Sequence, residues 1–163
     1  ELVGLEEDLL EKSPFNLSGG QMRRVAIAGI LSMDPDILIL DEPTVGLDPQ
    51  GQKEMMDLFT SIHEKKNQTI ILVTHDMNVV SEYCNRVIVM KKGEKVFDGS
   101  PRELFSQSQL LHDFDLDAPQ YMKIMRKINE KLGLDLNETV LSLEDIELNK
   151  KFIKERRDFK VDA

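Results

Sequence analysis

Two adjacent carboxylates, Asp41 and Glu42, directly follow a short apolar run at residues 37–40. The run has the length and composition of a strand buried on both faces of a parallel sheet. Ligands of open α/β sheets bind beyond the carboxyl ends of the strands, so the pair stands where a site is expected. One acid can hold Mg²⁺ and the other can act on a nucleophile. Because a buried structural acid pair would lose water without a partner, we interpret the pair as a site.

A second stretch with chemical potential is Ser18-Gly19-Gly20-Gln21. A serine followed three positions later by glutamine has the spacing of a capping box at a helix start. The two glycines leave the first backbone amides without side chains over them, and a bare helix N-terminus favours an anion such as phosphate. On these four residues alone, an ordinary capped helix and a phosphate-receiving helix are both compatible.

His75 follows a second apolar run, at residues 69–74. The two runs and the helical pattern between them have the length of a strand–helix–strand unit, whose crossover is parallel and right-handed. This topology predicts that His75 lies at the same sheet edge as the acid pair. A lone histidine at a strand end is usually structural, but one beside an acid pair is better explained as a contact to a phosphate.

Local signals predict the elements that position these residues. A helix over residues 18–33 should stop at Asp34-Pro35, because the residue before proline is pushed out of the α region. Arg23 and Arg24 on this helix are expected to be solvated or salt-bridged rather than phosphate ligands, with Arg23, near the first turn, kept as a candidate for a phosphate contact. The residues expected to pack inward are Val25, Ile27, Ala28, Ile30 and Leu31. Asp48 before a proline predicts the next helix start, and that helix should run to about residue 66.

The second half of the chain predicts a short helix capped by Asp76, strands at 87–90 and 95–97, and a helix beginning near residue 100. Composition shifts after about residue 107. There a helix opened by Pro119 and ended by Gly133 is expected to place four residues on one face. They are Tyr121, Met125, Ile128 and Leu132. This stripe can pack on the body of the protein or against a second copy. A last helix should be capped by Ser142-x-x-Asp145.

Composition bounds the function. The chain has 163 residues, 40% of them hydrophobic, and a net charge of −9, which argues against a duplex-binding surface. The single cysteine, Cys84, is expected to be a small core residue in a reducing compartment. No signal peptide is visible, and the longest apolar stretch, 25–31, is too short to span a bilayer.

In their order and spacing, these motifs resemble those of the nucleotide-binding subunits of ABC transporters. Residues 17–21 are similar to the signature motif, and residues 37–42 to the Walker B strand with its catalytic glutamate. Residues 46–48 are similar to the D-loop, and residues 74–76 to the switch histidine. The likeness covers roughly the first hundred residues. It implies an α/β fold: the C-terminal part of a P-loop NTPase domain, with parallel strands, flanking helices and a small helical extension.

The resemblance implies a role for each matching residue, with ATP and Mg²⁺ as cofactors. Asp41 would hold Mg²⁺, Glu42 would polarise the attacking water, and His75 would contact the γ-phosphate. Asp48 would couple two sites across a dimer. The residues that would clamp the γ-phosphate held by the opposite subunit are Ser18, Gly19, Gly20 and Gln21.

Residues 14–29, 46–49 and 100–103 look most like the second ATPase subunit of energy-coupling factor (ECF) transporters, whose relatives include cobalt-uptake ATPases. The implied work is ATP-driven import of a vitamin or a transition-metal ion such as cobalt. Implied partners are a second ATPase subunit and integral membrane subunits, with this protein peripheral on the cytoplasmic face. No nucleic acid is expected.

The phosphate-cradling pattern G-x-x-x-x-G-K-[ST] does not occur in these residues. We therefore expect the C-terminal part of a longer ATPase, residues 1–106 belonging to the ATPase domain and 107–163 to a helical extension, and we expect the chain alone to be inactive. Two alternatives stay open. One is the C-terminal lobe of a DNA-repair or chromosome-maintenance ATPase, although no heptads precede Ser18. The other is a non-catalytic dimerisation module built on the extension.

Overall fold

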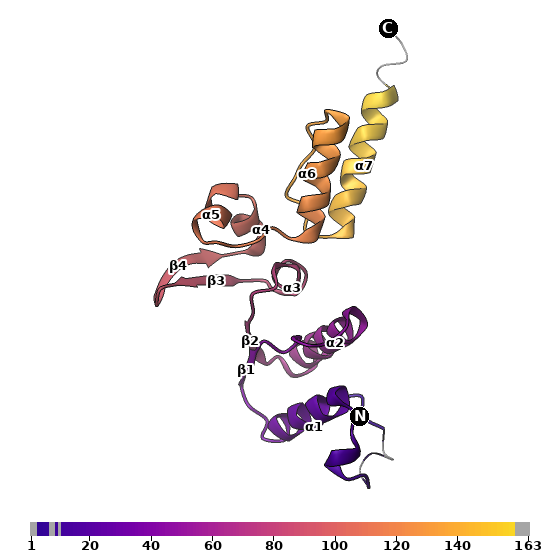
Figure 1. The fold of residues 1–163 in the computed structure, drawn as a ribbon, viewed down its shortest axis with the longest axis vertical. Helices are drawn as coiled ribbons and strands as arrows, with labels where there is room; N and C mark the ends of the chain where they lie inside the picture. The colour runs from indigo at the N-terminus through magenta and orange to yellow at the C-terminus, as the bar shows by residue number, and fades with distance from the viewer. Residues whose placement is uncertain (1–2, 7–8, 10, 159–163) are drawn as a thin grey trace. The chain divides into compact units, whose positions relative to one another are not determined.

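The structure is a computed structural model that describes residues 3–6, 9 and 11–158. The chain forms two compact units, Glu1–Thr74 and His75–Ala163 (Figure 1). The predicted boundary between the ATPase domain (residues 1–106) and the helical extension (107–163) differs from this division and stays a prediction. Among the described residues, no helix combines the length and apolar character needed to cross a bilayer.

The first unit contains the predicted strand–helix–strand arrangement. Its elements in chain order are η2 (Pro14–Asn16), α1 (Gly19–Leu31), β1 (Ile37–Asp41), α2 (Pro49–Lys66) and β2 (Thr69–Val73). β1 and β2 pair in parallel, with Ile37 opposite Thr69 and Asp41 opposite Val73. The carboxyl ends of both strands therefore lie at one edge of the sheet.

Among the residues that the structure describes, the sheet is covered on one face only, which corrects the expectation of burial on both faces. Leu38 and Leu40 are buried, whereas Ile39 between them is 66% exposed. Along β1, exposed and buried side chains alternate, because successive side chains of a strand point to opposite faces of the sheet. The exposed apolar side chains of the two strands are Ile37, Ile39, Ile71 and Val73. α2 contacts β2 and buries an apolar face of its own.

Part of the predicted inward face of α1 was also wrong. Ile27 and Leu31, four residues apart on one stripe, are buried. Val25 and Ile30 are 41% and 42% exposed, because both lie off that stripe, Val25 towards the opposite face of the helix.

The second unit combines a hairpin with short helices. Its elements are α3 (Met77–Tyr83), β3 (Val87–Lys91), β4 (Glu94–Gly99), α4 (Pro101–Phe105), α5 (Ser108–Asp113), α6 (Gln120–Leu132) and α7 (Leu143–Asp158). β3 and β4 are antiparallel. The turn between them places Lys92 and Gly93 at positive φ, the backbone of a type I′ hairpin turn.

The core of this unit joins the hairpin side to the C-terminal helices. Its buried cluster consists of Met77, Val80, Val89, Leu104, Phe105, Leu111, Met122 and Leu141. Cys84 packs partly buried against this cluster, and burial raises the pKa of its thiol. Both α6, through Met122, and the segment before α7, through Leu141, thus contribute to this core.

The predicted stripe on α6 packs largely within the extension. Met125 belongs to a buried cluster with Leu136 and Val140, against which Tyr121, Ile128 and Ile146 pack. Accordingly, α6 and α7 lie side by side (Figure 1). Leu132, by contrast, is 66% exposed. Gly133 ends α6 in the left-handed conformation, as predicted.

The predicted cap of α7 is present and also ties that helix to α4. The amide of Asp145 donates to the Ser142 hydroxyl at 3.3 Å. The Asp145 carboxylate accepts from the Leu141 amide at 2.9 Å, and its two oxygens accept from the Arg102 guanidinium at 2.9 and 3.0 Å. Burial alone would raise the pKa of Asp145, but these hydrogen bonds outweigh it and lower the pKa.

Candidate functional site

The N-terminus of α1 is capped by hydrogen bonds, and its first two residues are glycines without side chains. The Ser18 hydroxyl accepts from the Gln21 amide at 3.2 Å, and the Gln21 side chain accepts from the Ser18 amide at 2.9 Å, so the predicted capping box is present. A Cβ placed on Gly19 or Gly20 would meet no atom within 4 Å. Within the described part of the chain, the tip is therefore open to a ligand.

The acid pair lies at the edge where β1 ends. Asp41 is the last residue of the strand and is exposed. Glu42 has φ +46°, the left-handed region, which costs energy in a residue with a side chain. Its amide donates to the Val73 carbonyl at 2.9 Å, and its carboxylate accepts from the Thr74 hydroxyl at 3.4 Å. Glu42 is thus tied to the end of β2 through both backbone and side chain.

A short turn connects Glu42 to Asp48. The Val45 amide donates to the Glu42 carbonyl at 3.3 Å, and the Leu47 amide donates to the Thr44 carbonyl at 3.2 Å. Thr44 is buried, with 4% of its surface exposed. These contacts give the turn a defined backbone conformation rather than that of an open loop.

Asp48 is the predicted N-cap of α2, and its carboxylate accepts from the Gly51 amide at 2.9 Å. A Cβ on Gly51 would lie 2.8 Å from that carboxylate oxygen, so a larger residue there would displace the capping carboxylate. Asp48 therefore has a structural task as a cap, beside the coupling role that the resemblance implies for it.

Sequence reasoning missed the role of Arg23. Its guanidinium donates to the Pro43 carbonyl at 2.9 Å and to the Val45 carbonyl at 3.2 and 3.3 Å. The prediction of a solvated or salt-bridged side chain was therefore wrong for Arg23. It was correct for Arg24, which pairs with Glu54 at 3.1 Å. No local pattern distinguishes the two arginines, because the carbonyl partners lie about twenty residues further along the chain.

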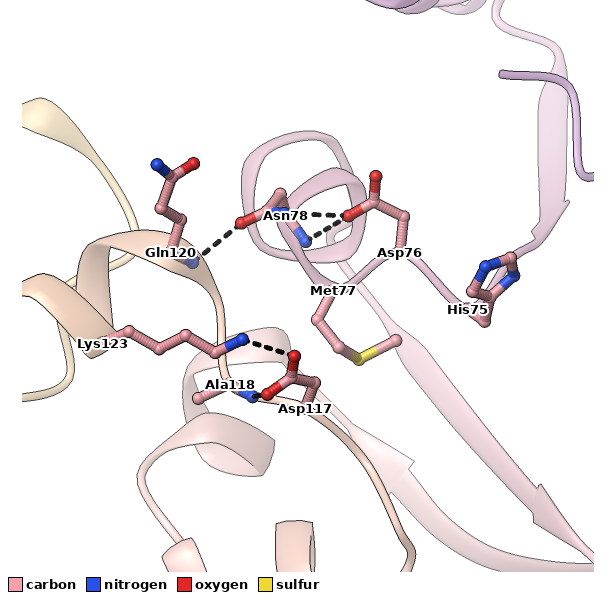
Figure 2. A pocket seen from close by; sticks show the side chains of 8 residues that line it. All are labelled: His75, Asp76, Met77, Asn78, Asp117, Ala118, Gln120 and Lys123. Carbon is pink, nitrogen blue, oxygen red and sulfur yellow. Dashed lines mark hydrogen bonds and ion pairs between the residues drawn. The ribbon is translucent and has the colours of Figure 1, made fainter. Parts of the chain in front are cut away.

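His75 begins the second unit and helps to line a cavity of about 390 Å³ (Figure 2). The complete lining is His75, Asp76, Met77, Asn78, Asp117, Ala118, Gln120 and Lys123. The cavity lies between the start of α3 and the residues around the start of α6. That His75 shares an edge with Asp41 and Glu42 stays a prediction.

A chain of hydrogen bonds connects residues that line this cavity. Asp76 caps α3 by accepting from the Asn78 amide at 2.9 Å and from the Asn78 side chain at 3.1 Å. The Asn78 side-chain oxygen in turn accepts from the Gln120 amide, the first of α6, at 2.8 Å (Figure 2). Lys123, also in the lining, pairs with Asp117 and holds the pKa of that carboxyl below its ordinary value. The segment that follows His75 is thus fastened to the start of α6.

Comparison with solved structures decides the fold. The chain superimposes on cbiO1 from Clostridium perfringens, described as part of the ABC transporter complex cbiONQ, with a TM-score of 0.63 and 38% identity over 82% of this chain and 50% of that one. It also matches MJ0796, a bacterial ABC transporter cassette, with a TM-score of 0.53 and 37% identity over 61% of this chain and 43% of that one. The chain therefore has the fold of part of an ABC ATPase domain.

Curated relatives give higher sequence identity to this chain. The energy-coupling factor transporter ATP-binding protein EcfA2 of Bacillus cereus is 53% identical over 90% of this chain and 50% of the relative. EcfA2 of Bacillus subtilis (strain 168) is 52% identical over 89% of this chain and 52% of the relative. The segment therefore spans about half the length of the curated relatives it matches.

A family model also matches residues 6–81 of the segment. It is described as an AAA domain, putative AbiEii toxin, type IV TA system. The match covers the signature-like helix tip, the acid pair and His75. The toxin is named in the description of the family model and is not a statement about this chain. These comparisons confirm the resemblance to ABC ATPases of the energy-coupling factor type.

Proposed function

We propose that this chain supplies the signature, Walker B, D-loop and switch-histidine parts of an ATPase that hydrolyses ATP to drive an importer of the energy-coupling factor type. The observation that carries the proposal is a single compact unit presenting both an uncovered, glycine-bearing helix tip and an acid pair at the end of a parallel strand. The first suits the oxygens of a phosphate and the second suits a metal ion and a water molecule.

The residues present fit the implied cofactors by their chemistry. Asp41, an exposed carboxylate at the strand end, is a hard oxygen ligand of the kind that Mg²⁺ takes. When bound, Mg²⁺ would neutralise charge on the phosphates. In this proposal Glu42 orients and polarises the attacking water, and its double tie to β2 restricts where its carboxylate can point. His75 contacts the γ-phosphate.

The remaining proposed ligands act across a dimer. Amides at the tip of α1, with Ser18 and Gln21, receive the γ-phosphate held by a second ATPase subunit, and Asp48 couples the two sites. Phosphoryl transfer depends on positioning and charge stabilisation more than on covalent chemistry. A site divided between two chains closes when nucleotide binds and opens after hydrolysis. ATP hydrolysis thereby drives a conformational change of the dimer.

We further propose that the protein works at the cytoplasmic face of the cell membrane, bound to integral membrane subunits, and that the cargo is a vitamin or a transition-metal ion such as cobalt. Support comes from the names of the relatives, an energy-coupling factor transporter and a cbiONQ complex. The net charge of −9 agrees with a partner other than nucleic acid.

The test compares the 163-residue chain with the full-length gene product assembled with its partner subunits. The chain alone should neither bind ATP tightly nor hydrolyse it, because it contains no phosphate loop. In the assembled protein, Glu42→Gln should lower kcat about 100-fold or more while ATP binding is retained. Glu64→Gln, an exposed position on α2, is the matched control and should keep the wild-type rate. Single-turnover hydrolysis by the chain alone, or full activity of Glu42→Gln, would refute the proposal.

A further inference from the structure

Arg23 joins two parts of the first unit that the sequence keeps apart. It lies in the first turns of α1, a few residues from the open helix tip, and reaches the turn that follows Glu42. One guanidinium there makes three hydrogen bonds to two backbone carbonyls, those of Pro43 and Val45. A planar guanidinium with several fixed donors can span two acceptors in this way, whereas a lysine ammonium cannot do so with the same geometry.

The turn that Arg23 contacts begins at a residue with an unfavourable backbone conformation. It begins at Glu42, whose left-handed backbone is unfavourable and persists only where surrounding contacts fix it. Two of those contacts come from the same turn and from β2: the Val45 amide donates to the Glu42 carbonyl, and the Val73 carbonyl accepts from the Glu42 amide. Arg23 holds the carbonyl of Val45, so it acts on the residue whose amide closes the turn.

We propose that Arg23 is a positioning residue: it clamps the Pro43 and Val45 carbonyls, fixes the left-handed turn at Glu42 and so aims that carboxylate for reaction. It touches no reacting atom itself. The same clamp fastens the start of α1 to the segment that leads to Asp48, so the helix tip and the acid turn move together. This inference rests on the proposed function for its kinetic consequence, but not for the clamp, which is a property of the chain.

The clamp is tested first in the 163-residue chain, where no activity is needed. Amide hydrogen exchange at Val45 and Leu47 should speed up about 10- to 100-fold in Arg23→Gln, the change expected when hydrogen bonds from a charged group are lost. Exchange at the Leu58 and Ile62 amides of α2 should stay unchanged. Lys53→Gln, which removes an exposed cation from α2, is the control for charge and should leave Val45 and Leu47 as protected as in the wild type.

The kinetic arm uses the assembled full-length protein. Arg23→Gln should lower kcat about 10- to 100-fold with the KM for ATP changed less than about twofold, because displacement of a positioned group by an ångström carries that order of cost. Arg23→Lys should be intermediate in kcat. Wild-type kcat in Arg23→Gln, or parallel changes of kcat and KM, would overturn the proposal. If Arg23→Gln fails to fold, Arg23→Lys decides, and wild-type kcat in it refutes the clamp. Failure of the proposed function shows separately, as full activity of Glu42→Gln.

Discussion

Substituting Gly20 by alanine separates what the fold needs from what a ligand would need. Gly20 lies in the first turn of α1, and a Cβ there would meet no atom within 4 Å. Its φ is not in the left-handed region, so the conformation allows any side chain. Glycine in a helix costs about 0.5–1 kcal/mol relative to alanine, and less near the end. Among the described residues, no close contact at this position requires a glycine and so offsets that cost.

We therefore expect Gly20→Ala to stabilise the chain by about 0.5 kcal/mol, since the substitution lowers the entropy of the unfolded chain without a clash. For a chain of this size the midpoint of thermal unfolding should rise by about 1–2 °C. In the assembled full-length protein, the added methyl group would stand over an amide proposed to face phosphate. Hydrolysis should then fall about tenfold or more, although the protein is more stable.

Two other glycines of the same unit serve as matched controls. Gly29→Ala, also without neighbours within 4 Å, should stabilise the chain similarly and leave hydrolysis unchanged. Gly51→Ala should destabilise it, because the new Cβ would lie 2.8 Å from the Asp48 carboxylate. Thermal unfolding and steady-state hydrolysis measure all three variants. A less stable Gly20→Ala, or one that hydrolyses ATP at the wild-type rate, would refute the reasoning.

Two further predictions concern the second unit. Asn78→Ala removes the acceptor for the first amide of α6 and a donor to the α3 cap, so it should cost about 1–2 kcal/mol in urea unfolding and speed hydrogen exchange at residues 120–123; unchanged exchange there would contradict the link. Asp145 has a lowered pKa in the folded chain, so its contribution to stability is present above its ordinary pKa and is lost as pH falls through the lowered value. The stability difference between the wild type and Asp145→Asn should shrink below about pH 4; a constant difference from about pH 7 to about pH 2 would show that the ionised form is not favoured.

Local chemistry made much of the fold predictable. Ser18, Asp48 and Asp76 accept hydrogen bonds from amides two or three residues ahead, so their caps depend on neighbouring residues alone. Gly133 ends α6 because it adopts positive φ at no steric cost. The parallel pairing of β1 and β2 followed from the length of the connection between them.

Features set by distant parts of the chain could not be predicted. The partners of Arg23 are carbonyls about twenty residues away, and a guanidinium on a helix surface gives no sign of which acceptor it will meet. The left-handed backbone of Glu42 likewise depends in part on β2, because its amide donates to the distant Val73 carbonyl. The candidate residues themselves were predictable as types and spacings, because phosphate and metal chemistry restrict which side chains can serve.

The apolar runs of β1 and β2 are explained only if something covers their open face. Parallel sheets occur with both faces covered, and their strands are accordingly apolar throughout, as these are. In the first unit, however, the side chains of Ile37, Ile39, Ile71 and Val73 are between 46% and 66% exposed. Two strands covered by a helix on one side are a marginal sheet on their own. The open face therefore agrees with the proposal that this chain acts within a larger ATPase domain, in which Asp41 and Glu42 end an interior strand rather than an edge.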